Sequence, residues 1–544
     1  MKKLIFSFFC FGILVSCATV EQRDTVDLLI TNAKVYTVDS DFSTAEAFAV
    51  KDGKFIAVGT TEELLNQYNA TKVIDADGST IVPGLIDAHA HFYGLGMQLQ
   101  TVNLTGTKSF AKVIQKIVDF QKQRNSEFVV GRGWDQNDWE IKEFPTKDTL
   151  DILFPDTPVV ITRIDGHALL ANQAALNAAG ITAETKFEGG DIEVKNGRLT
   201  GIVVDNPMEL VQKAIPQTSR KEEIAGLLEA QKIAFSYGLT TVVDAGLDRN
   251  VIELIDSLQQ AGKLDIRIYA MISNTKENLD YYLNRDFLKT EKLNVRSVKF
   301  YSDGALGSRG AALKEPYSDK HNHYGALLSP VSEFKKTAAR IAVSKYQMNT
   351  HAIGDSANAM VLKTYDSLIG DDDNRRWRVE HSQIIDESDF KYFSKNIIPS
   401  VQPTHATSDM YWAEDRLGKE RLREGAYAYK KLLDEAGIIV LGTDFPVEQV
   451  NPFLTFYAAV VRKDTQNYPE DGFLKNQALS REETLRGMTI WAAYANFEET
   501  EKGSIEPGKF ADFVILNQDI MEVSEEKIPE TKAVNTYLGG EKVK

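Results

Sequence analysis

The sequence predicts an α/β protein whose main body is a (β/α)8 TIM barrel. A small β-sandwich formed by both chain ends and a cap domain inserted after the first barrel strand complete the expected fold. Three observations predict this architecture. Strand-like runs alternate with segments of helical apolar spacing through the middle of the chain. Both ends are rich in short strands separated by Gly and Pro turns. The 544-residue length also exceeds what one ordinary compact domain needs.

The barrel prediction depends on the number of strand-like runs. Eight runs remain when residues 94–220, which have strands and helices of their own, are set aside as an insertion. Stretches with helical apolar spacing, such as 221–237 and 332–346, lie between most of them. Eight strands alternating with helices is the number that closes a (β/α)8 barrel. The runs are residues 79–91, 239–246, 265–272, 295–305, 347–355, 376–383, 397–406 and 437–447.

These patterns divide the chain into four parts. Residues 1–17 are expected to form a signal peptide, and residues 94–220 an inserted subdomain. The remaining two parts are each made from separate stretches of chain: the β-sandwich is expected from 26–80 plus 501–544, and the barrel from 81–93 plus 221–500.

The first 17 residues predict export. Lys2 and Lys3 precede a twelve-residue apolar run that is too short to span a bilayer comfortably. The run ends in LVSC, residues 14–17, which resembles the lipobox of bacterial lipoproteins, where the cysteine becomes the lipid-bearing N-terminus. The alternative is an ordinary signal peptide with a coincidental cysteine. We predict an exported bacterial lipoprotein, anchored to the membrane through lipidated Cys17 and facing the periplasm or the cell exterior.

Composition excludes several classes of function. With Cys10 removed and Cys17 acylated, the mature chain has no thiolate for catalysis, metal binding or a disulfide. A net charge of −16 without basic patches argues against a nucleic-acid partner. The expected partners are a small-molecule substrate and the lipid bilayer that holds the anchor, and a homodimer is left open.

Metal-ligating residue types gather at the ends of the predicted strands. In a (β/α)8 barrel the catalytic groups lie at the C-terminal ends of the strands. His89 and His91 end the first run, and residues two apart on a strand project to the same side. Imidazoles together with a carboxylate suit zinc or another borderline divalent ion. A single HxH is a weak signal, whereas an ordered set across five strands is demanding. The predicted ligands are His89, His91, Lys299, His351, His381 and Asp444.

Several motifs follow one another along the chain: PGLIDAHAHF (83–92), VKFYSDGALGSRGAAL (298–313), THAIGD (350–355), RVEHSQ (378–383), VQPTH (401–405) and GTDFPV (442–447). Together they resemble motifs of the amidohydrolase superfamily, in particular the YtcJ-like hydrolases of amidohydrolase family 3. The flanking stretches 29–39 and 503–516 are similar to the two halves of that family's small β-sandwich. The resemblance runs from about residue 27 to the C-terminus, so it covers nearly all of the mature chain.

The resemblance implies a role for each predicted ligand. His89, His91 and Asp444 would hold the more buried of one or two divalent ions, with zinc expected, and His351 with His381 would hold a second. Lys299 matches a lysine that takes up CO₂ to become a bridging carbamate; an ion-paired strand-end lysine is the alternative. Metal-activated water would then hydrolyse an amide, N-acyl, formamide or cyclic amide rather than a peptide bond. The expected catalytic residues are Asp444, Lys299 and His381.

Seven further residues are predicted to bind substrate. The inserted segment is carried as a cap over the barrel mouth in similar proteins, although a local packing role is the alternative for its candidates. Asp303 and Arg309 follow the fourth barrel strand on a Gly-rich loop, where Asp303 is expected to orient Lys299 or a histidine. The full set is Trp134, Asp135, His167, Asp303, Arg309, Gln402 and His405.

Three other residues are predicted to lie outside the site. Glu380 precedes His381, so it is expected to point away from the site and to be structural. His321 and His323 form a second HxH in a loop and are expected on the surface.

Two alternatives to the proposed hydrolase stay open. The same metal platform can act on another bond, by lactone or phosphoester hydrolysis or by isomerisation, because one fold hosts several chemistries. The second alternative is a solute-binding barrel that has lost catalysis. A binder has little reason to keep all six predicted ligands, which favours the enzyme.

Overall fold

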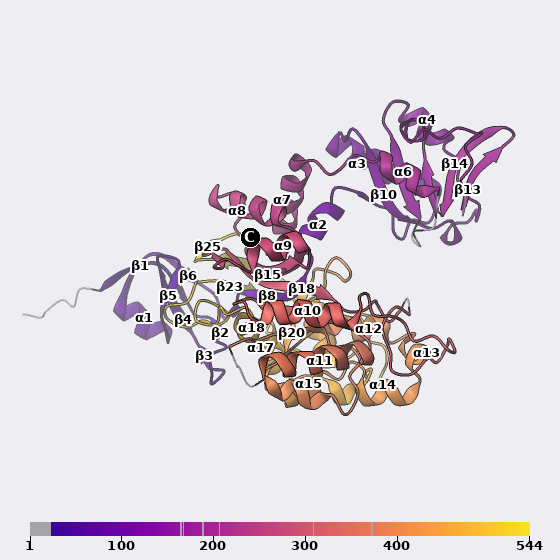
Figure 1. Ribbon diagram of the computed structural model, residues 1–544. Helices are drawn as coiled ribbons and strands as arrows, with labels where there is room; N and C mark the ends of the chain where they lie inside the picture. Colours follow the sequence, from indigo (N-terminus) through magenta and orange to yellow (C-terminus); the bar gives the residue numbers. More distant parts are fainter. Residues whose placement is uncertain are drawn as a thin grey trace, which may run out of the picture.

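The structure is a computed structural model that describes residues 23–163, 166, 168–187, 190–205, 207–307, 309–370 and 374–544. Figure 1 shows the sheets of the two chain ends on one side, the barrel in the centre and the inserted segment reaching away from it. Among the residues so described, no helix is both long and apolar enough to cross a membrane.

Eight strands pair in parallel to form the central sheet. Its edges, β22 and β8, meet through two backbone hydrogen bonds: the Asp444 amide donates to the His89 carbonyl and the His91 amide to the Phe445 carbonyl, both at 2.8 Å. The sheet is therefore a nearly closed barrel, and the eight predicted barrel strands are confirmed. In sheet order they are β22 (Val440–Leu441), β21 (Ile398–Val401), β20 (Arg378–His381), β19 (Gln347–Ala352), β18 (Leu293–Tyr301), β16 (Arg267–Ser273), β15 (Leu239–Leu247) and β8 (Leu85–Ala90). A short strand, β17 (Leu288–Lys289), pairs antiparallel with β18.

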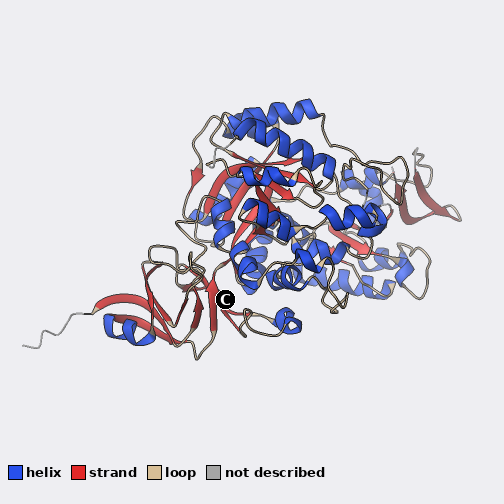
Figure 2. Cartoon of the chain, turned by 90° about the horizontal axis from the view of Figure 1, so that it is seen from below, coloured by secondary structure: helices blue, strands red, loops and turns tan. Residues whose placement is uncertain are grey.

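The barrel strands are buried on both faces, as parallel strands between a filled interior and a layer of helices must be. Every residue of β8 is buried, and β15 is buried except at Gly246. Figure 2 shows the helices around the strands. The barrel helices are α8 (Arg249–Gln260), α9 (Lys276–Tyr282), α10 (Val331–Ala342), α11 (Asp355–Ile369), α12 (Pro403–Asp409), α13 (Ala413–Leu417), α14 (Lys419–Gly425), α15 (Tyr429–Ala436), α16 (Pro452–Val461), α17 (Arg481–Gly487) and α18 (Ile490–Ala495).

Two small sheets at the chain ends share one hydrophobic cluster. One sheet consists of N-terminal strands, and the other combines strands from both chain ends. Phe48, from the N-terminal part, lies 4.9 Å from Phe513, and Phe513 stacks on Tyr537 at 4.3 Å between ring centroids. One sheet has the order β5 (Lys54–Gly59), β4 (Ala47–Lys51), β1 (Asp24–Thr31), β6 (Tyr68–Asp75), with α1 (Thr61–Gln67) between β5 and β6 in sequence. The other has the order β25 (Glu541–Lys542), β24 (Ala533–Leu538), β23 (Phe513–Leu516), β7 (Thr80–Pro83), β2 (Lys34–Tyr36), β3 (Thr44–Ala45).

The inserted segment has its own sheet and its own hydrophobic clusters. The sheet order is β13 (Gly190–Lys195), β14 (Arg198–Asp205), β12 (Ala168–Ala171), β11 (Val159–Arg163), β10 (Val129–Trp134), β9 (Val102–Asn103). Its helices are α3 (Phe110–Arg124), α4 (Asp148–Leu153), α5 (Gln173–Ala178) and α6 (Met208–Ala214).

Two helices connect the inserted segment to the barrel. The chain leaves through α2 (Phe92–Gln98) and returns through α7 (Arg220–Ser236), and the two pack closely at Gly96 and Gly226. A Cβ atom on Gly226 would lie 2.5 Å from the Gly96 carbonyl oxygen, so only glycine allows this approach. The insertion thus begins directly after His91, at the edge of the barrel mouth.

Candidate metal centre

The six predicted ligands converge at the carboxyl ends of the barrel strands. The Nζ atom of Lys299 lies 3.0 Å from His89 Nε2, and His91 Nε2 lies 3.2 Å from Asp444 Oδ1. The rings of His351 and His381 are 4.4 Å apart, and those of His89 and His381 are 4.9 Å apart. One compact cluster therefore contains His89 and His91 at β8, Lys299 on β18, His351 on β19, His381 on β20 and Asp444 after β22.

Asp444 lies at the centre of this cluster. Its Oδ1 atom faces His91 and also lies 3.7 Å from His89 Nε2, while Oδ2 lies 3.4 Å from His405 Nε2. Two groups have all their ligand atoms within 4.8 Å of one another: His89, His91, Asp444 and His381, His405, Asp444. His405, predicted as a substrate contact, therefore lies among the ligands.

Unusual backbone conformations bring some of these side chains inward. His381 has φ 71°, Ser382 φ 41° and Asp444 φ 62°, all in the left-handed region that non-glycine residues seldom adopt. Such conformations persist where the surrounding structure requires them, and they cluster at functional sites. At the end of β20 the turn allows both Glu380 and His381 to reach the centre, although consecutive strand residues normally face opposite sides.

Burial keeps three histidines of the centre neutral. It lowers the pKa of His89 to about 4 and that of His351 to about 3, and the nearby Lys299 charge adds to both shifts. Burial also lowers the pKa of His381 well below its usual value. A neutral imidazole has the free lone pair that a metal ligand needs. These three side chains are therefore in the ligand form at neutral pH.

Asp444 stays ionised in the same environment. Although burial opposes it, the neighbouring imidazoles of His405 and His91 hold the pKa of Asp444 well below its usual range. For His405, burial is outweighed by the neighbouring Asp444 carboxylate, which raises the pKa of its imidazole. The centre thus combines one carboxylate with several imidazoles.

The donor set fits a divalent cation. Three buried atoms of the cluster have no hydrogen-bond partner among the described residues: His351 Nε2, His405 Nε2 and Asp444 Oδ1. Buried polar atoms are almost always paired, so several unpaired acceptors in one place call for an ion or water. Imidazole nitrogens with a carboxylate oxygen and without a thiolate match the ligands of zinc and similar ions.

Two of the predicted substrate contacts instead support the histidines. Gln402 Oε1 lies 2.7 Å from His381 Nδ1. Asp303 Oδ1 lies 3.7 Å from His351 Nε2 and accepts a hydrogen bond from the Ile353 amide at 3.0 Å. Its other oxygen binds the amides of Gly354 and Ala312. Asp303 therefore holds the loop that follows His351, close to the expected orienting role.

The remaining predicted contacts lie in other surroundings. Trp134 is buried in the inserted segment and donates from Nε1 to the Ile161 carbonyl at 2.9 Å. Asp135 pairs with Arg163 at 2.6 Å, and Arg309 pairs with Asp319 at 2.7 Å. Their substrate-binding role stays a prediction. His167 and Cys17 lie outside the described residues.

Of the second HxH pair, His321 is exposed, as predicted. His323 is half-buried, and its Nε2 lies 2.9 Å from the Arg309 carbonyl oxygen. Neither residue belongs to the two ligand groups found in the described part of the chain.

Glu380 was predicted to point away from the site, and this prediction is wrong. Its carboxylate is fully buried and contacts His89 Nδ1 directly, while Arg378 lies 2.8 Å from its other oxygen. One signal in the sequence pointed to it: Arg378 and Glu380 are two residues apart on a buried strand, which places opposite charges on one face.

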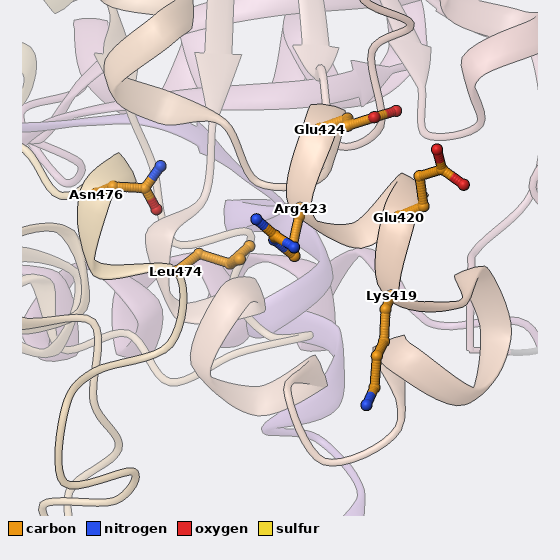
Figure 3. Close-up of a pocket in the computed structure, with 6 residues that line it drawn as sticks. All are labelled: Lys419, Glu420, Arg423, Glu424, Leu474 and Asn476. Atoms are coloured by element: carbon orange, nitrogen blue, oxygen red, sulfur yellow. The ribbon is translucent and has the colours of Figure 1, made fainter.

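A separate surface cavity of about 610 Å³ lies on α14 and the nearby loop (Figure 3). Its lining residues are Lys419, Glu420, Arg423, Glu424, Leu474 and Asn476, and none of them belongs to the cluster of ligands. The chemistry of the barrel therefore resides at the strand ends and not in this cavity.

Three known proteins are similar to nearly the whole of this chain. Protein LONG AFTER FAR-RED 3 of Arabidopsis thaliana is 32% identical over 540 residues, covering 95% of this chain and 91% of that protein. The putative amidohydrolase YtcJ of Bacillus subtilis is 29% identical, covering 93% and 97%. The N-substituted formamide deformylase of Arthrobacter pascens is 25% identical, covering 94% and 97%.

A solved structure shares both the fold and part of the sequence. An uncharacterized metal-dependent hydrolase from Pyrococcus horikoshii aligns with a TM-score of 0.77 at 27% identity, covering 92% of this chain and 99% of that chain. The model of the amidohydrolase family matches residues 72–544. The chain therefore belongs to the amidohydrolase family and is a metal-dependent hydrolase of that superfamily.

Proposed function

We propose that the protein hydrolyses a carbon–nitrogen bond other than a peptide bond, in an amide, N-acyl, formamide or cyclic amide substrate. One observation carries the proposal: neutral imidazoles and an ionised carboxylate from four barrel strands meet around buried polar atoms that lack a hydrogen-bond partner among the described residues. The formamide deformylase among the relatives supports this class of bond.

The chain's own residues supply the rest of the chemistry. A bound divalent cation would lower the pKa of a water and polarise the substrate carbonyl. Asp444, ionised and placed between His91 and His405, is positioned to accept the proton of the attacking water and to return it to the leaving nitrogen. His381, held by Gln402, faces the same space and can orient the carbonyl oxygen.

Zinc, as one or two ions, is the metal we propose, because the donor set is nitrogen and oxygen only. Lys299 as a carbamate would add an anionic oxygen ligand between His89 and the second group of ligands. We also propose that residues 94–220 act as a cap over the barrel mouth and that the two end sheets form a β-sandwich.

Lipid anchoring through Cys17 and export to the periplasm or cell exterior remain part of the proposal. Mass spectrometry of the mature N-terminus tests them. An acylated Cys17 is expected, and any other unmodified first residue would contradict the anchor.

A substrate screen tests the proposed reaction. Purified, metal-loaded protein is assayed on N-acyl amino acids, N-substituted formamides, cyclic amides and dipeptides, with metal content measured in parallel. The wild type is expected to hydrolyse at least one of the first three classes and not the dipeptides.

Two histidine variants make the screen specific. His89→Ala is expected to lose metal and turnover together, whereas His321→Ala removes an exposed histidine outside the centre and should match the wild type. Equal turnover by His89→Ala would disprove the mechanism. Fewer than about 0.5 ions per chain after reconstitution, far below the full occupancy of a zinc enzyme, would favour the solute-binding alternative.

A further inference from the structure

A fully buried ion pair lies directly behind the first metal-ligating histidine. Glu380 contacts Nδ1 of His89, and both side chains are completely buried. Arg378, two residues earlier on β20, places its Nε atom 2.8 Å from Glu380 Oε1. The same arginine donates to the Ala88 carbonyl at 2.5 Å and to the Ser400 hydroxyl at 2.8 Å. Glu380 therefore lies between a fixed cation and a ligand.

The neighbours of His89 determine which ring nitrogen carries the proton. An ionised carboxylate can only accept hydrogen bonds, so the nitrogen that faces Glu380, Nδ1, must donate. On the opposite side of the ring, Lys299 lies 3.0 Å from Nε2, and an ammonium can only donate. The lone pair of the neutral ring is thus on Nε2, the atom that faces Asp444.

Arg378 keeps Glu380 in the accepting form. The Arg378 guanidinium lies 2.8 Å from Glu380 Oε1, and a permanently charged cation at this distance favours the ionised carboxylate. The arginine lies against both carboxylate oxygens: its Nε is 2.8 Å from Oε1, and its Nη2 donates at 3.2 Å to Oε2, the oxygen that contacts His89. Because Arg378 is bound to the backbone of β8 next to His89, the pair also restricts the orientation of the ring.

We propose that Glu380 is a positioning residue: it holds His89 as the Nδ1–H tautomer and directs the Nε2 lone pair at the metal ion. The proposal rests on the metal centre described under the proposed function. Removing the outer partner of a metal-ligating histidine usually reduces metal affinity about 10–100-fold. Glu380 thereby links β20 with the ligand His89 on β8.

Metal affinity of the whole protein tests this role. Zinc dissociation constants are measured by competition with a chromogenic chelator for the wild type, Glu380→Ala and Glu380→Gln. Glu380→Ala is expected to weaken zinc binding about 10–100-fold. Glu380→Gln keeps an oxygen that can accept the Nδ1–H bond, so its affinity is expected between those of Glu380→Ala and the wild type.

Glu498→Gln is the matched control. Glu498 is also buried, at 2% exposure, and it pairs with Lys289 and Lys502. It bonds Asn294 at the amino end of β18, whereas the ligand Lys299 is near the other end. Glu498→Gln should lower the melting temperature without changing zinc affinity. Glu380 variants that lose thermal stability but bind zinc like the wild type would overturn the proposal.

A second measurement needs no variant at Glu380. In metal-free protein with ¹⁵N-labelled histidine, the nitrogen shifts of His89, assigned by their loss in His89→Gln, report its tautomer. A protonated Nδ1 with an unprotonated Nε2 is expected, and the reverse tautomer would overturn the proposal. A wild type that binds no zinc would instead overturn the proposed function itself.

Discussion

Burial sets the charge of single residues at the centre, and Lys299 shows this most clearly. Its side chain is 1% exposed, and burial lowers the pKa of its ammonium to about 8 although Glu380 and Asp444 oppose the shift. An ordinary lysine, with a pKa near 10.4, is almost fully protonated at pH 8, whereas about half of Lys299 would be neutral there. Only the neutral amine has a lone pair that can attack CO₂.

We therefore predict that Lys299 takes up CO₂ in a pH-dependent way. Native mass spectrometry in bicarbonate should show a mass increase of one CO₂ at pH 8. The increase should be much smaller at pH 6, where the neutral fraction is roughly 50-fold lower. Lys299→Arg, whose guanidinium stays charged, should never gain this mass. An unmodified wild type at pH 8 would contradict the prediction.

At the scale of elements, Asp87 joins the two edges of the barrel. Its Oδ1 atom accepts from the amides of Thr443 at 3.0 Å and His89 at 3.2 Å, and Oδ2 accepts from the Thr443 hydroxyl at 2.7 Å. The residue is 2% exposed. Burial raises the pKa of Asp87 to about 7, although these hydrogen bonds oppose the shift.

The raised pKa predicts how Asp87 affects stability. The folded chain holds the proton more tightly than the unfolded chain, whose aspartates titrate near 3.9, so stability is lost as the pH rises through about 7. In metal-free protein, Asp87→Asn should exceed the wild type in unfolding free energy at pH 8, by up to about 4 kcal/mol. At pH 5 the difference should fall to about 1.5 kcal/mol, because only the unfolded-state aspartate is ionised there.

Denaturant unfolding at the two pH values measures this difference. Asp77→Asn, at an exposed aspartate, is the control and should follow the wild type at both. A difference between Asp87→Asn and the wild type that does not change with pH would show that the Asp87 charge is not its cause.

A second prediction at this scale concerns the contact between α2 and α7. Alanine normally favours a helix over glycine by about 1 kcal/mol. In Gly226→Ala, however, the new Cβ would lie 2.5 Å from the Gly96 carbonyl, so the helices must separate. We expect a net loss of about 1–3 kcal/mol in unfolding free energy, seen as a lower melting temperature. A stabilised variant would show that the two helices separate without cost.

For the whole molecule, the barrel brings together ligands that are far apart in sequence. The unfolded chain cannot hold them around one ion, so metal binding adds to the stability of the folded state alone. At a free zinc concentration of 100 times Kd, the gain should be about 2.7 kcal/mol. Chelation should lower the melting temperature and zinc should restore it. A His89→Ala protein that gains as much stability from zinc as the wild type would contradict this prediction.

The framework of the protein and most residues of the candidate metal centre could be predicted from local patterns in the sequence. Strand burial and helical spacing are local patterns, so the eight strands could be read from them, and His89, His91, Lys299, His351, His381 and Asp444 follow from their places at strand ends. The motifs that carry the resemblance also identified the family, which the family model confirms.

Which side chains contact one another became visible in the folded chain alone. The contact of Glu380 with His89 and that of His405 with Asp444 join strands that are distant in sequence, and no local pattern records such a distance. Alternation of side chains along a strand even predicted the wrong direction for Glu380. That alternation holds for regular strand backbone, whereas His381 has φ 71°. The charge states also depend on burial by the whole barrel, since desolvation is a property of the surroundings and not of the residue type.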